Sequence, residues 1–286
     1  MGRLVPRGRQ TGQLADFLDE VAEAGYEVIE TGPFGFLPTD PEVLQAECTK
    51  RGIRVVAGTQ FGILHRPEAW EQTEREMRAN ASVLKAIGAH HLVYLPPMLR
   101  DLQTGGWAED PNLSDADWKL LAGNANRLGK LLKEDYDVTM VVHPHGDSHI
   151  ENREQIDRFF AETDPEYVSF CLDTGHLEYG EVDTVDLIRS YPDRIGLVHI
   201  KQMDPEVVQR VRRENLSFGE AVSLGVCVTP DAGQPKVGAV IDALAALDKE
   251  LYVIVEQDLY PCAPDVPLPL AIETRRVLAD NHLGIH

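Results

Sequence analysis

The sequence predicts one parallel (β/α)8 barrel, and three observations lead to that fold class. Helix-like and strand-like segments alternate from residue 13 to the end of the chain, which implies a parallel sheet covered by helices. Four of the strand-like segments are apolar runs that reach a His, Asp or Glu at their C-terminal end. A parallel barrel gathers such ends at one mouth. The length of 286 residues suits one barrel of about 250 residues with additions.

The first half of the chain alternates four helices with three strands. Pro41 stands in the first turn of a helix, where proline is favoured, and Ser114 is placed to cap another helix. The pair Pro96 and Pro97 ends the third strand, since proline lacks the N–H that a sheet needs. The predicted helices are Gln13–Glu23, Pro41–Arg51, Pro67–Ile87 and Ser114–Lys133, and the strands are Tyr26–Glu30, Arg54–Thr59 and His91–Leu95.

The second half contains the four strands that end in ligand-type side chains. His143 and Asp173 are 30 residues apart, and Asp173 and His199 are 26 apart. Both spacings suit one strand–helix–strand unit. From His199 to Glu256 the spacing is 57, so residues 204–235 are interpreted as an inserted mouth loop. The strands are Met140–His145, Ser169–Asp173, Ile195–Lys201 and Leu251–Asp258, and the helices are Asn152–Ala161, Val182–Ser190, Val237–Ala246 and Pro269–Asp280.

The N-terminus departs from a complete barrel. Seven strands are counted, so an eighth is expected before the helix at Gln13. Only Met1–Gly12 precedes that helix, and its Leu-Val-Pro-Arg-Gly string resembles a protease-cleavage site left by an expression tag. We therefore expect a missing or truncated first strand. Residues 1–12 are interpreted as a tag or a shortened start, and 13–286 as one barrel domain.

Composition argues against a nucleic-acid-binding protein and against a membrane-spanning one. The net charge is −20, from 27 basic and 47 acidic residues, which disfavours nucleic acid as a partner because phosphates need a basic surface. No apolar run approaches the roughly 18 residues of a membrane span. The four cysteines are far apart and form no CxxC pair, which favours a reducing cytoplasm. Self-association into a homo-oligomer is left open.

The four strand-end side chains predict a metal site. His143, Asp173, His199 and Glu256 would meet at the mouth and could close around one hard or borderline divalent ion. Each also has a simpler role: Asp173 in a helix-capping turn, the histidines in core packing, and Glu256 in an ion pair. For His143, contact with substrate is a further alternative.

Five further side chains are candidates for substrate binding or proton transfer. His145 and Lys201 each lie two residues from a candidate ligand and so face the same side of an extended strand. His176 follows Asp173 by three residues, Glu30 ends a strand, and Asp258 follows Glu256 by two. Lys201 and His176 are candidate acids or bases, and Asp258 could instead orient a ligand histidine. The alternatives are a helix cap for His176 and solvated or ion-paired rim residues for the others.

These segments resemble the xylose-isomerase-like sugar phosphate isomerase/epimerase superfamily of TIM barrels, and within it most of all the inosose (2-keto-myo-inositol) dehydratase branch. The likeness runs from about Gln13 to the end, in ETGPFGFLPT at 30–39, HPHG at 143–146, DTGH at 173–176, VHIK at 198–201 and VEQD at 255–258. The resemblance implies a divalent ion, most often Mn²⁺ or Co²⁺, with Mg²⁺ and Zn²⁺ as further candidates. The superfamily usually holds it with Glu, Asp, His and Glu, and His143 departs from that set.

The resemblance implies a metal-dependent lyase that removes water from a keto-polyol such as 2-keto-myo-inositol through an enediolate. A bound ion would polarise the ketone and its neighbouring hydroxyl, Glu256 would take part in catalysis, and Lys201 or His176 would protonate the departing hydroxyl. Reprotonation of the same intermediate would give an isomerase or epimerase instead. An abasic-site endonuclease on the same fold is opposed by the charge of −20. A non-catalytic sugar-binding or partner protein is the alternative of a different class.

Overall fold

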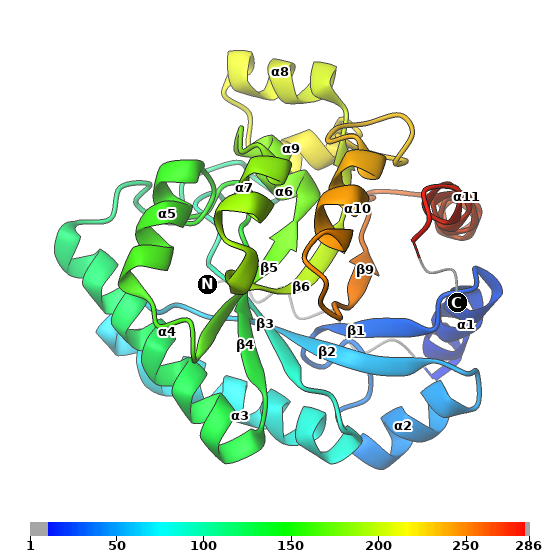
Figure 1. Ribbon diagram of the computed structural model, residues 1–286, viewed down its shortest axis with the longest axis horizontal. Coiled ribbons are helices and arrows are strands. Elements are labelled where there is room, and N and C mark those ends of the chain that lie inside the picture. The colour runs from blue at the N-terminus through cyan, green and yellow to red at the C-terminus, as the bar shows by residue number, and fades with distance from the viewer. Residues whose placement is uncertain (1–10, 284–286) are drawn as a thin grey trace.

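A parallel sheet of seven strands forms the centre of the computed structural model, which describes residues 11–283 (Figure 1). The strands follow the order β1-β2-β3-β4-β5-β6-β9, so chain order is kept around the sheet. Helices surround its outer face, and the arrangement confirms the predicted TIM-barrel class. The strands are β1 Val28–Pro33, β2 Arg54–Phe61, β3 His91–Leu95, β4 Thr139–Val142, β5 Val168–Asp173, β6 Ile195–Ile200 and β9 Val253–Val255.

Capping residues fix where several of the helices begin and end. Ser114 and Asn152 each form a capping box at the start of a helix, and Gly88 ends α3 with a positive φ of 73° that glycine adopts without strain. The helices are α1 Thr11–Glu23, α2 Pro41–Thr49, α3 Trp70–Ile87, α4 Asp115–Tyr136, α5 Arg153–Glu162, α6 Thr174–Tyr179, α7 Thr184–Ser190, α8 Pro205–Glu214, α9 Phe218–Ser223, α10 Val237–Ala245 and α11 Pro267–Asp280, with short 3-10 turns at Pro67–Ala69 and Pro192–Arg194.

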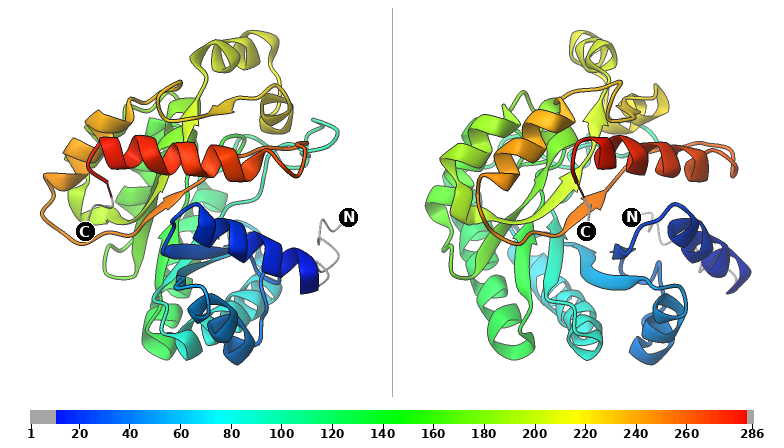
Figure 2. Two further views of the ribbon diagram at one scale, coloured as in Figure 1. Left: turned by 90° about the vertical axis from the view of Figure 1, so that its right-hand side faces the viewer. Right: turned by 45° about the vertical axis from the view of Figure 1, so that its right-hand side comes forward.

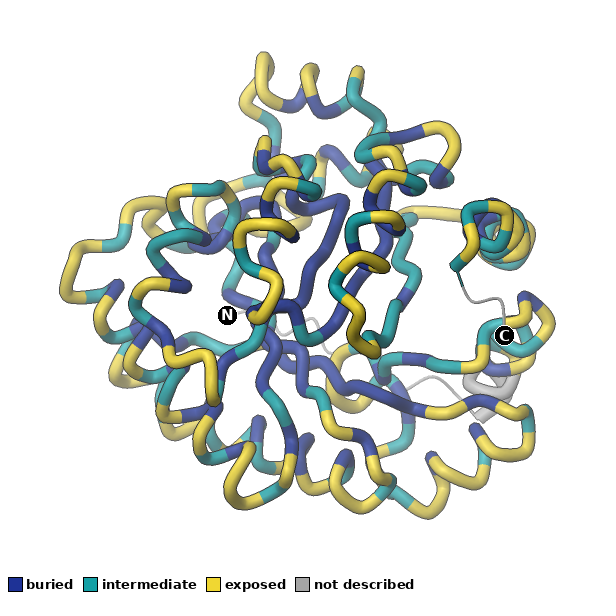
Figure 3. The backbone as a smooth tube through the Cα atoms, in the orientation of Figure 1, coloured by how far each residue is buried: buried dark blue, intermediate teal, exposed yellow. Residues whose placement is uncertain are grey.

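A small apolar layer lies directly beneath the mouth of the barrel. Ala57, Val93, Val141, Cys171 and Leu197 form a buried cluster of their own. Three of them stand two residues before His143, Asp173 and His199, so they share a strand face with those side chains. The buried strands appear as the dark centre of Figure 3. This layer therefore forms an apolar floor under the polar residues of the mouth.

The sheet is not closed by hydrogen bonds between its first and last strands. β1 pairs with β2 and β9 pairs with β6, and no pairing joins β1 to β9. Helices α1 and α11 flank this seam, as both views of Figure 2 show. No strand precedes β1 within residues 11–283, which agrees with the expected loss of the first strand. The interpretation of residues 1–12 as a tag or shortened start falls largely outside the described residues.

The segment at 204–235, predicted as an inserted mouth loop, contains two helices. α8 and α9 rise above the barrel in Figure 1, and an antiparallel pair, β7 Gln202–Met203 with β8 Cys227–Val228, holds the segment at its base. These elements bury a separate apolar cluster that includes Met203, Val211, Phe218 and Cys227. The insert is thus a folded addition on the mouth side of the barrel.

Some predicted boundaries were wrong. The helix predicted at 182–190 is preceded by a further helix, α6, which begins directly at the end of β5. The last strand is shorter than predicted, so Glu256 and Asp258 follow β9 instead of lying within it. α6 begins there because the Asp173 carboxylate accepts the backbone N–H of His176 and so caps the helix.

Candidate active site

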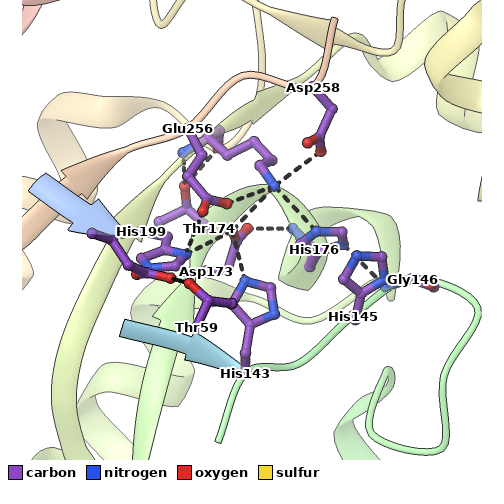
Figure 4. Close-up of polar contacts among 12 residues, drawn as sticks. Thr59, His143, His145, Gly146, Asp173, Thr174, His176, His199, Glu256 and Asp258 are labelled. Atoms are coloured by element: carbon purple, nitrogen blue, oxygen red, sulfur yellow. Dashed lines mark hydrogen bonds and ion pairs between the residues drawn. The ribbon is translucent and has the colours of Figure 1, made fainter. Parts of the chain in front are cut away.

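Four ligand-type side chains meet at the mouth of the barrel (Figure 4). One ligand atom from each of His143, Asp173, His199 and Glu256 lies within 4.8 Å of the other three. Nε2 of His143 is 3.2 Å from Oδ2 of Asp173, and Nδ1 of His199 is 3.3 Å from Oε1 of Glu256. The structure brings together the four residues that the strand-end pattern selected.

The chemistry of this cluster fits a divalent ion. Nδ1 of His199 is buried and has no hydrogen-bond partner among the described groups, although it faces carboxylate oxygens of Asp173 and Glu256 at 3.7 and 3.3 Å. A cation among these atoms would satisfy the ring nitrogen and both carboxylates. Cys171 also lies close to His143 and His199, but it is part of the apolar floor, and burial raises the pKa of its thiol to about 12. Two imidazoles and two carboxylates remain as the donor set.

Glu30 contacts the cluster from β1, the edge strand at the start of the sheet. Its Oε2 lies 2.9 Å from Nε2 of His199, and its Oε1 accepts a hydrogen bond from Thr59. Glu30 and His199 are both almost fully buried. A carboxylate that accepts the second ring N–H of a ligand histidine fixes the ring and its tautomer. The contact suits a residue that positions His199. Glu30 also lines the cavity, so its predicted contact with substrate stays a prediction.

Lys201 lies beside the cluster with its amine among three carboxylates. Nζ is 3.0 Å from Glu256, 3.0 Å from Asp258 and 3.5 Å from Asp173. Burial opposes the charge of this lysine, but the carboxylates, Asp173 first, outweigh burial and hold its pKa well above the usual value. Asp258 thus pairs with Lys201 and not with a histidine, which was one predicted role. Lys201 is a buried cation beside the candidate ligands.

The segment Asp173-Thr174-Gly175-His176 places several of these groups at once. Oδ1 of Asp173 accepts the backbone N–H of His176 at 2.8 Å and so caps α6. Thr174 Oγ1 donates to the carbonyl of Lys201 at 2.6 Å and accepts its N–H at 2.9 Å. A Cβ at Gly175 would lie 2.6–2.8 Å from the Lys201 side chain. The capping role and the candidate ligand role of Asp173 are therefore compatible.

Two histidines stack at the edge of the cluster. The ring centroids of His145 and His176 are 3.9 Å apart, and Phe218 of the insert packs against both rings at 5.0 and 4.8 Å. Burial lowers the pKa of His145 to about 4 and holds that of His176 well below its usual value. Both rings are therefore neutral near pH 7. Nε2 of His176 lies 3.2 Å from Nζ of Lys201.

A cavity of about 490 Å³ opens onto these side chains. Its walls include His143, His145, His176, His199 and Lys201, and it continues past Glu256 towards the seam between β1 and β9. The part at the seam is apolar and is formed by α1 and α11 through residues such as Val21 and Leu268. The cavity is large enough for a small polyol beside the cluster.

Sequence reasoning missed Thr59, Gly146, Thr174, Gly175 and Phe218. Thr174 and Gly175 stand between two candidate residues, and Gly146 directly follows His145, so their positions were an available signal. Thr59 and Phe218 carry no comparable signal, because their contacts with Glu30 and with the stacked histidines are made over long sequence separations.

Comparison with known proteins identifies the family. The model of the xylose isomerase-like TIM barrel family matches residues 18–278. The chain belongs to the xylose isomerase-like TIM barrel family. An inosose dehydratase of Geobacillus thermodenitrificans is 30% identical over 267 residues, which cover 92% of this chain and 88% of the relative. The relatives of this family are enzymes, so the prediction of an enzyme is confirmed.

Two solved structures show the same fold at lower identity. The IOLI protein with a bound zinc atom has a TM-score of 0.73 and 16% identity, covering 96% of this chain and 93% of its own. The probable 3-DHS dehydratase AsbF of Bacillus anthracis has a TM-score of 0.72 and 12% identity, and the match covers 96% of this chain and 95% of AsbF.

Within residues 11–283, no helix combines the length and apolar character needed to cross a membrane.

Proposed function

We propose that this protein is a divalent-metal-dependent dehydratase of a keto-polyol, with 2-keto-myo-inositol as the first substrate to test. The observation that carries the proposal is the position of Lys201. Its buried amine lies 3.0 Å from Glu256 and 3.5 Å from Asp173, two members of the candidate metal cluster. The inosose dehydratase relatives support the same reaction.

The residues divide into those that hold the ion and those that handle substrate. His143, Asp173, His199 and Glu256 would hold the metal, for which we propose Mn²⁺ or Co²⁺ ahead of Mg²⁺ or Zn²⁺. When bound there, such an ion polarises a ketone and the adjacent hydroxyl, and so acidifies the neighbouring C–H. His145, His176, Lys201 and Asp258 face the cavity or its edge and would bind the remaining hydroxyls. Glu30 keeps His199 in place.

Water loss requires a base that takes the C–H proton and an acid that protonates the departing oxygen. Glu256 would take the C–H proton, and its carboxylate lies 3.0 Å from Nζ of Lys201. Asp258, which is not a candidate metal ligand, lies 3.0 Å from Nζ of Lys201 and would favour the protonated amine. Lys201 lies beside the cluster, so we assign it as the general acid. His176, whose Nε2 lies 3.2 Å from Nζ of Lys201, would bind a hydroxyl next to the one that leaves. Burial of both groups strengthens their hydrogen bonds to substrate, because little water competes. Asp258 would hold the lysine in place through its 3.0 Å contact.

The test separates dehydration from epimerisation. Metal-loaded protein is incubated with 2-keto-myo-inositol in deuterated water, and both dione absorbance and substrate C–H exchange are followed. Dehydration predicts both signals, whereas Lys201→Met should slow dione formation more than exchange. Exchange with only an epimer as product would favour the epimerase alternative. No exchange and no product with any keto-polyol would contradict both, and would favour a non-catalytic binding protein. Cytoplasmic location and self-association stay predictions.

A further inference from the structure

The backbone of one residue, Gly146, contacts both stacked histidines. Nδ1 of His145 lies 2.7 Å from the carbonyl oxygen of Gly146. The N–H of the same residue donates to Nδ1 of His176 at 3.0 Å. The carbonyl and the N–H of Gly146 are thus used by two different rings, as the labelled residues in Figure 4 show.

These two contacts require different tautomers. A carbonyl oxygen can only accept, so Nδ1 of His145 carries its proton and Nε2 of His145 has a lone pair. A backbone N–H can only donate, so Nδ1 of His176 has the lone pair and Nε2 of His176 carries the proton. An uncharged imidazole ring carries only one N–H, so these two contacts fix the role of all four ring nitrogens. The pair therefore presents one acceptor nitrogen and one donor N–H.

Neither of these Nε2 atoms has a suitable protein partner among the described residues. His145 lines the cavity, and no hydrogen bond to its Nε2 exists within residues 11–283. The N–H of His176 faces Nζ of Lys201 at 3.2 Å. An ammonium group cannot accept, and its own protons face the carboxylates of Glu256, Asp258 and Asp173. The Nε2–H of His176 therefore lacks an acceptor, which an oxygen atom of a bound ligand would supply.

We propose that His145 and His176 form a hydroxyl-recognition site whose donor and acceptor atoms are set by the backbone carbonyl and N–H of Gly146. A hydroxyl group can donate to Nε2 of His145 and accept from Nε2–H of His176. An ether, a fluorine or a methylene group cannot do both. This inference rests on the proposed function, because it names the group of the polyol that the two histidines select.

Gly146 is the positioning residue of this arrangement. A Cβ on Gly146 would lie 2.7 Å from a ring carbon of Tyr179 and 3.0 Å from one of Phe218. Both rings are buried and packed against each other, so an added methyl must displace the peptide or the rings. Within the described residues, Gly123 offers a matched control, since a Cβ there meets nothing within 4 Å.

The tautomers can be measured without any activity. Long-range ¹H–¹⁵N spectra of zinc-loaded protein with labelled histidine report which ring nitrogen carries the proton, and His145→Phe and His176→Phe assign the two rings. We expect the proton on Nδ1 in His145 and on Nε2 in His176. Gly146→Ala should alter these signals, while Gly123→Ala should leave them unchanged. The same tautomer in both rings of the wild type would overturn the proposal, whether or not the Gly146 variant folds.

The recognition itself is tested with analogues of 2-keto-myo-inositol that each lack one hydroxyl or carry it as a methyl ether. The hydroxyl that leaves and the one beside the ketone are set aside, because their loss removes the chemistry. At one remaining position both changes should lower kcat/KM at least about 100-fold, and His145→Phe should shrink that difference. Tolerance at every position, or an unchanged difference in His145→Phe, would overturn the proposal. If no keto-polyol reacts at all, the proposed function fails while the spectra still decide the tautomers.

Discussion

Glu151 gives the protein a measurable pH dependence of stability. This side chain follows the β4 loop, and burial first, then the charge of Asp147, raises its pKa from 4.5 to about 7. The native protein therefore keeps the Glu151 proton to a higher pH than the unfolded chain does. Between pH 4.5 and 7 the native state binds more protons, so stability falls as pH rises through this window.

The size of the effect follows from the shift. Each pKa unit corresponds to about 1.4 kcal/mol, so a rise from 4.5 to about 7 corresponds to at most roughly 3.5 kcal/mol. The shift already includes the opposing charges of Arg212 and Arg100. The side chain is only partly shielded from water, which reduces the net value to roughly 2 kcal/mol. That cost is fully present above pH 7 and absent below pH 4.5.

Glu151→Gln removes the titrating group but keeps an oxygen that can accept the backbone N–H of Asp147. The free energy of unfolding, measured by urea denaturation, should rise by roughly 2 kcal/mol more at pH 8 than at pH 5 in this variant relative to wild type. The exposed Glu154 serves as the control, and Glu154→Gln should change stability by no more than about 0.5 kcal/mol. Parallel pH profiles for wild type and Glu151→Gln would refute the reasoning.

Three further predictions concern the site. Chelation should abolish activity and Mn²⁺ or Co²⁺ should restore it; Asp173→Ala and Glu256→Ala should each lose most bound metal by elemental analysis, and stoichiometric metal in both would contradict the ligand set. Glu30→Gln should weaken metal binding about 10- to 100-fold in competition with a coloured chelator, because His199 loses its carboxylate partner; unchanged affinity would remove Glu30 from that role. Gly175→Ala should slow product formation while metal stays bound, since its Cβ would displace the Lys201 side chain; wild-type turnover would show that this lysine is not needed where it stands.

The meeting of His143, Asp173, His199 and Glu256 was predictable because the pattern that places these residues is local. Each candidate ligand ends an apolar run, and parallel strands bring such ends together whatever the helices between them do. The same reasoning correctly placed Lys201 beside His199, because alternate residues of a strand share a face. No alignment or partner residue was required for either prediction.

The roles of Glu30 and Asp258 could not be decided in the same way. Glu30 and His199 are 169 residues apart in the chain, and only the curvature of the sheet brings them into contact. A carboxylate at the mouth can face substrate, a histidine or a lysine, and the choice depends on which cation comes nearest. The fold of the insert was also beyond the pattern, because α8 and α9 are short and pack chiefly on each other and on the loops beneath them.

The open seam between β1 and β9 links metal binding to the closure of the barrel. Backbone hydrogen bonds join neighbours elsewhere in the sheet, but here the two edges are connected through side chains. His199 contacts Glu30, which lies in β1, and Glu256, which directly follows β9. An ion held by this cluster would oppose separation of the two edges, so metal release and opening of the barrel would be coupled events. Amide exchange in β1 and β9 should accordingly quicken on chelation, while exchange in β3 and β4, on the opposite side of the sheet, should change little.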